Sequence, residues 1–71
     1  MAVRFYGKVG TKGYNSVVVV KDMCEAHVYN VEEKKFHRND DYVKVAFDLS
    51  HYDELSEEEA ERVLRGLGYV K

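Results

Sequence analysis

Three groups of residues have types and spacing that could carry chemistry. Cys24 and His27 stand three positions apart, the spacing of one half of a zinc site, but the sequence contains no second doublet to complete it. Ser50, His51 and Asp53 have the residue types of a catalytic triad. Such close neighbours cannot converge as nucleophilic catalysis requires. We therefore expect no metal, no cofactor and no enzymatic activity.

A third group, Gly7, Gly10 and Gly13, recurs at intervals of three and encloses two lysines, a composition that could cradle a phosphate. The spacing matches neither the Walker A pattern nor the dinucleotide-binding pattern. No predicted helix follows that could direct its N-terminus at a phosphate. The segment from Gly10 to Gly13 is therefore predicted to be a hairpin turn, because glycine adopts the positive φ angles of tight turns.

Length and composition indicate one small globular domain that spans residues 1–71. A hydrophobic content of 45% is enough for one core. The single cysteine cannot form an internal disulfide, whereas secreted domains of this size usually carry several. The longest purely apolar run, residues 17–20, is far shorter than the roughly 20 residues of a membrane span. We expect a cytoplasmic protein with no membrane partner.

Charge is unevenly distributed along the chain, although the formal net charge is only −2. Residues 1–21 contain basic side chains and no acidic one, so all 13 acidic residues lie in residues 22–71. Many of these acids fall between Asp53 and Glu61. This acidic stretch is either a solvated face or a docking surface for a basic partner.

Periodicity predicts the elements that must position these residues. Alternation of apolar and polar side chains predicts strands over residues 3–9, 14–23, 25–31 and 42–49. Ser56 and Glu59 form a capping box, which begins a helix with one apolar stripe, and Gly68 is placed to end it. The predicted class is α+β: a small antiparallel sheet of three to five strands with one C-terminal helix packed on one face, in the order ββββα.

The second predicted strand should be buried on both faces. Its four consecutive valines, residues 17–20, place two apolar side chains on each side of the sheet, whereas one helix covers a single face. Alternation directs Tyr6, Tyr29 and Tyr42 away from the helix and directs Val45 and Phe47 toward it. The uncovered face should therefore present valine and tyrosine side chains, unless a loop or residues 69–71 fold over it.

An exposed apolar patch of this kind is typical of an interaction site. We expect a non-enzymatic interaction module, acting as a regulator or inhibitor, that binds a protein partner or a second copy of itself through this face or through the basic hairpin. Single-stranded nucleic acid is the alternative partner, because basic side chains hold phosphates and tyrosines stack on bases. The predicted partner-binding residues are Arg4, Tyr6, Lys8, Lys12, Val18, Val20, Tyr29, Tyr42 and Lys44.

Overall fold

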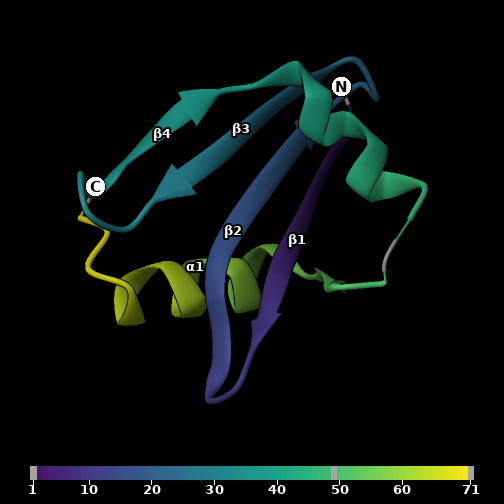
Figure 1. The fold of residues 1–71 in the computed structure, drawn as a ribbon. Helices are drawn as coiled ribbons and strands as arrows, with labels where there is room; N and C mark the ends of the chain where they lie inside the picture. The colour runs from purple at the N-terminus through teal and green to yellow at the C-terminus, as the bar shows by residue number, and fades with distance from the viewer. Residues whose placement is uncertain (1, 49, 71) are drawn as a thin grey trace.

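The computed structural model, which describes residues 2–48 and 50–70, consists of one antiparallel sheet with a helical segment on each face (Figure 1). Its strands are β1 (Val3–Gly10), β2 (Gly13–Lys21), β3 (Glu25–Asn30), β4 (Lys35–Arg38) and β5 (Tyr52–Leu55). They lie in the order β4-β3-β2-β1-β5, and the C-terminal helix α1 (Glu57–Gly66) packs against β1 and β2. The predicted α+β class is confirmed.

β1 and β2 form the predicted hairpin at the centre of the sheet. Residues 11–12 make the turn, and Gly13 has a φ of 117°, a conformation that residues with a side chain rarely adopt. The register pairs Phe5 with Val19. Because successive side chains of a strand point to opposite faces, this hairpin carries apolar groups to both sides of the sheet.

Both faces of β2 are buried, as its valines predict. Val17 is 0% exposed and Val18 is 1% exposed, and the two belong to separate clusters on opposite faces. The cluster between the sheet and α1 contains Val17, Tyr29, Leu55, Ala60 and Leu64. The cluster on the other face contains Tyr6, Val18, Val20, Ala26 and Val45. The sheet is therefore the middle layer of three.

The cover on the second face is the segment that we predicted to be the last strand. Residues Asp40–Ala46 form a 3-10 helix, η1, so the prediction of a strand over residues 42–49 is wrong. Asn39 caps this helix, because its Oδ1 accepts a hydrogen bond from the Asp41 amide at 3.2 Å. Alternation fails as a guide here, because side chains three residues apart share one side of a 3-10 helix, whereas side chains two apart share one side of a strand. Leu49, the end of the predicted strand, lies outside the described residues.

The start of η1 is held to β3 by hydrogen bonds with the main chain of Ala26. The Asn39 amide donates to the Ala26 carbonyl at 2.9 Å, and the Ala26 amide donates to Oδ1 of Asp40 at 3.3 Å. Arg38 at the end of β4 donates two hydrogen bonds of 3.1 Å to the same Asp40 carboxylate. These contacts fix where η1 begins, and its apolar side chains then pack on the sheet.

Helix α1 begins and ends as the sequence predicts. Oγ of Ser56 accepts from the Glu59 amide at 3.1 Å, while the Glu59 carboxylate accepts from the Ser56 amide at 3.2 Å, so the capping box is complete. Gly68 has a φ of 90°, and the Tyr69 amide donates to the Leu64 carbonyl at 2.9 Å. The chain therefore turns back after α1 and lays Tyr69 against the core.

Two strands of four residues that alternation does not predict form the edges of the sheet. β4 follows a turn over residues 31–34 and pairs with β3, and β5 pairs with β1 directly before the cap of α1. Runs this short carry too little alternation to stand out. They widen the sheet to five strands, and η1, which lies between them in the chain, covers its second face.

Candidate functional site

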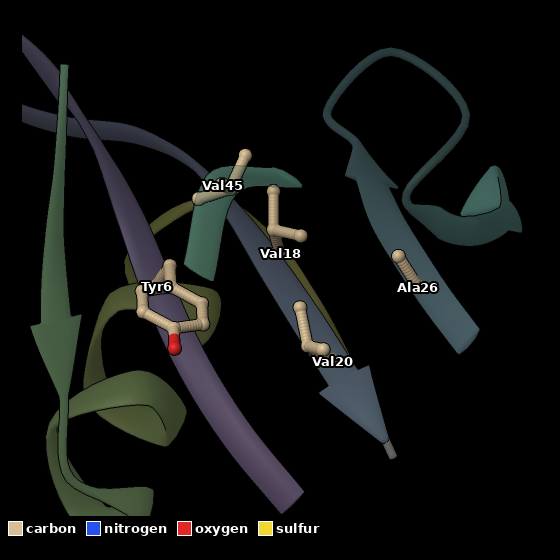
Figure 2. Close-up of a cluster of buried hydrophobic side chains, with 5 residues drawn as sticks. All are labelled: Tyr6, Val18, Val20, Ala26 and Val45. Carbon is tan, nitrogen blue, oxygen red and sulfur yellow. The ribbon is translucent and has the colours of Figure 1, made fainter. Parts of the chain in front are cut away.

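The valine and tyrosine face that we predicted to be open is covered. Tyr6, Val18 and Val20 are each 1% exposed because η1 lies over them, and Figure 2 shows Val45 of η1 grouped with them. The prediction that these side chains lie on an accessible surface is therefore wrong. The other possibility, that a segment between strands folds over this face, is the one that the structure shows.

Tyr29 is buried on the opposite face of the sheet, against α1. β3 directs Val28 toward η1, so the following residue must face α1, and the prediction that Tyr29 points away from α1 is wrong. The Tyr29 ring lies 5.4 Å from that of Phe36 and 5.5 Å from that of Tyr69 between centroids. Its hydroxyl donates to the Leu67 carbonyl at 3.3 Å. Tyr29 is a core residue, only 2% exposed.

The basic residues of the predicted site remain on the surface. Arg4 and Lys8 are exposed on β1, Lys12 is exposed in the β1–β2 turn, and Lys44 is exposed on η1. None of these four forms an ion pair within residues 2–48 and 50–70. Tyr42, the remaining predicted residue, is half-buried on η1. Of these five, the structure brings Tyr42 and Lys44 together in one groove.

That groove has a volume of about 660 Å³ and lies between η1 and the start of β5. Pockets that hold ligands in proteins span about 300–1,000 Å³, so its size is sufficient to receive side chains of a partner. Its lining combines apolar and aromatic groups with charged and polar ones. The lining residues are Asn39, Asp41, Tyr42, Lys44, Val45, Phe47, Asp48, Ser50, His51 and Tyr52.

Phe47 is unusually exposed for a large apolar side chain in this groove, since 77% of its surface is exposed. The alternation of residues 42–49 predicts that Phe47 and Val45 both point toward α1. This prediction is wrong for both, because Phe47 is exposed and Val45 is buried in the cluster on the other face of the sheet. With about 3.0 residues per turn, positions three apart share one side of a 3-10 helix. Asp41, Lys44 and Phe47 therefore form an outer row, while Tyr42 and Val45 pack on the sheet.

β5 and the residues before it form the opposite wall of the groove. The Val9 amide donates to the His51 carbonyl at 2.9 Å, and Lys8 pairs with Tyr52 in the β1–β5 register. Burial, together with the neighbouring Tyr42, raises the pKa of Tyr52 above its ordinary value of 10.0, so this wall presents a neutral phenol.

The rim of the groove carries charges of both signs. Lys44 is basic, and Asp41 and Asp48 are acidic. Hydrogen bonds from the Ser50 hydroxyl and from its amide, the latter at 3.1 Å, hold the pKa of Asp48 below its ordinary range. Asp48 is therefore ionised at neutral pH, and a strongly acidic or strongly basic partner would meet like charge on one side of the groove.

Cys24 and His27, the pair with zinc-like spacing, make contacts with different groups. Cys24 is exposed, and its thiol lies 3.9 Å from the Lys21 carbonyl. His27 instead contacts the Glu25 carboxylate at 2.5 Å. Across residues 2–48 and 50–70, no group of three His, Cys, Asp or Glu side chains is arranged to hold a metal ion.

Comparison of the chain with protein-family models, with curated proteins and with solved structures found no match. The part of the chain that the structure describes has no helix long and apolar enough to cross a membrane. The groove beside η1 is therefore the observation on which a functional argument can be built.

Sequence reasoning did not place Phe47, His51 or Tyr52 in the site. The signal that could have found Phe47 is Asn39 followed by two aspartates, which is a helix start as well as a turn. A helix beginning there changes the period of the following residues from two to three. The change turns Phe47 outward and leaves Val45 inside.

Proposed function

We propose that this chain is a non-enzymatic interaction module that binds a protein partner through the groove between η1 and β5. The observation that carries the proposal is Phe47, which exposes 77% of its surface on the rim of that groove. Burying a side chain such as phenylalanine contributes about 1.5–3 kcal/mol. A partner that covers Phe47 would recover this free energy, which the isolated chain leaves unused.

The composition of the groove supports a protein partner. Aromatic residues are enriched at the centres of protein interfaces, and three line this groove: Tyr42, Phe47 and Tyr52. Tyr42 and Tyr52 also pack against the core cluster under η1, so their positions are fixed before binding. A rigid aromatic surface loses little conformational entropy when a partner docks.

Single-stranded nucleic acid is the second candidate. Lys44, which shares the groove with aromatic rings, and the exposed Arg4 and Lys8 on β1 favour it, since phosphates need cations and bases need stacking partners. Asp41 and Asp48 on the same rim oppose it, because they would repel a phosphate backbone. The sequence pI of about 5.9 also lies far below that of typical nucleic-acid-binding domains.

Selection with two libraries tests the proposal. Random peptides displayed on phage and a random pool of single-stranded RNA are offered to the immobilised protein, and selected molecules are mapped on the isotope-labelled chain by NMR. We expect peptides that shift the amide signals of Tyr42, Lys44 and Phe47 and that bind the Phe47→Ala variant at least about tenfold more weakly. The matched control is Val70→Ala, because Val70 is 85% exposed and lies outside the groove.

Two results would contradict the proposal. Selected peptides that bind equally well to wild type and Phe47→Ala would exclude the groove as the protein-binding surface. Selection of RNA alone, with a salt dependence that falls when Lys44 is replaced, would establish the nucleic-acid alternative.

A further inference from the structure

We infer that the partner seated in this groove is a second copy of the same chain, so that the exposed Phe47 of each copy enters the groove of the other. This inference rests on the proposed function and names its partner. The contact is isologous, meaning that the same surface is used on both copies around a two-fold axis.

The projecting group and the receiving groove belong to one patch. Phe47 is 77% exposed and lines the groove together with half-buried Tyr42 and Tyr52. A two-fold contact requires a self-complementary surface, in which residue i meets residue j and residue j meets residue i. A patch that contains both an exposed ring and an aromatic recess satisfies this requirement.

The charges on the outer row of η1 also suit a second copy of the chain. Lys44 and Asp41 stand three apart on the outer row of η1, next to the exposed Phe47. When two such rows meet in opposite directions, Lys44 of one copy faces Asp41 of the other, and the pair forms twice. A row with one charge of each sign is complementary to itself, whereas a partner of a single sign would meet one attraction and one repulsion.

The two edges of the sheet are less suited to pairing between copies. The open edge strand β4 carries Lys35 and Arg38, and the open edge strand β5 carries Asp53 and Glu54. Two-fold pairing of either edge with itself would place like charges together, and charged edge strands are a common protection against such pairing. The groove beside η1 lacks this protection.

Analytical ultracentrifugation of the full chain tests the inference. The wild type is measured from about 10 µM to about 1 mM, where weak self-association is detected. We expect a monomer–dimer equilibrium in this range. Phe47→Ala should raise the dissociation constant by about tenfold or more, while Val70→Ala should leave it unchanged. Circular dichroism of each variant shows whether the fold is retained.

A pair of charge-reversal variants tests the two-fold geometry itself. Lys44→Glu alone and Asp41→Lys alone each create two like-charge contacts, so both should be monomeric at concentrations where the wild type is dimeric. Their equimolar mixture creates two opposite-charge contacts and should form a heterodimer. Neither a heterologous contact nor a general loss of stability would produce this recovery.

The outcomes separate this inference from the proposed function. A wild type that stays monomeric up to about 1 mM, or a dimer that Phe47→Ala does not weaken, overturns the inference. So does a mixture of the charge variants that remains monomeric. In each case peptides selected at the groove would still support a protein-binding module whose partner is another protein.

Discussion

The ring of Tyr14 lies directly against the backbone of Gly7. A Cβ atom at position 7 would stand 2.7 Å from Cδ1 of Tyr14 and 3.0 Å from Cδ1 of Leu55. The Tyr14 ring thereby crosses β1, and its hydroxyl donates to Oδ2 of Asp53 at 2.8 Å on β5. The missing side chain of Gly7 allows one residue of β2 to reach over β1 and hold the edge strand that forms a wall of the groove.

Gly7→Ala should therefore destabilise the protein. The added methyl group must displace Tyr14 or Leu55, and overpacking of this kind costs about 1–3 kcal/mol. Chemical denaturation followed by circular dichroism measures the loss. The matched control is Gly66→Ala, where nothing lies within 4 Å of the added atom and where alanine favours the helix by up to about 1 kcal/mol. Equal effects at the two positions would show that contact with Tyr14 is not the cause.

Val45 and Phe47 should respond in opposite ways to truncation. Val45 is 5% exposed in the core beneath η1, so Val45→Ala should lower the free energy of unfolding by about 1–3 kcal/mol. Phe47→Ala removes a larger side chain, yet it should change stability by less than about 0.5 kcal/mol because the ring is in solvent. Urea denaturation of both variants, measured in dilute solution, decides this point. A larger loss of stability for Phe47→Ala than for Val45→Ala would indicate that Phe47 is buried, as in the strand that alternation predicts.

The anchor of η1 should make stability depend on pH. Hydrogen bonds from Arg38, and then from the Ala26 amide, hold the pKa of Asp40 below its ordinary value of 3.8. Because this pKa is lower in the folded state, the carboxylate stabilises the fold fully above the unfolded pKa. The stabilisation is lost as pH falls through the lower, folded value. Unfolding measured from neutral to acidic pH should show this loss, and Asp40→Asn should reduce the acid dependence.

The control for this pH experiment is Asp41→Asn. The Asp41 side chain is exposed and has no hydrogen bond or ion pair within residues 2–48 and 50–70. Its replacement should leave the acid limb of the stability curve as it is in the wild type. An equal change for both asparagine variants would mean that net charge, rather than the anchor of η1, sets the acid sensitivity.

The N-terminal cap of α1 offers a further prediction. Ser56→Ala removes the acceptor of the Glu59 amide and should cost about 1 kcal/mol. Ser56→Asp keeps an acceptor at the cap and should retain most of the stability. Thermal unfolding of both variants measures the difference. If alanine and aspartate were equally destabilising, the capping hydrogen bond would not be what the serine provides.

The sequence predicts those parts of the fold that depend on local patterns. The β1–β2 hairpin, the doubly buried valines of β2 and the caps of α1 follow from glycine chemistry, apolar runs and the capping box. The site depends on one ambiguous segment, because residues 42–47 fit a period of two as well as a period of three. The contacts of Asn39 and Asp40 with Ala26 of β3, which join distant parts of the chain, decide between these periods. The position of Phe47 follows from that decision.

The two covers of β2 both come from the second half of the chain. Residues 2–38 contain β1 to β4, whereas η1 and α1 lie in residues 39–70. During synthesis the N-terminal strands are complete first, at a stage when Val17–Val20 have no cover on either face. An uncharged valine run of this kind is prone to pair with other chains. A chain cleaved near residue 38 would lose both covers and should therefore aggregate.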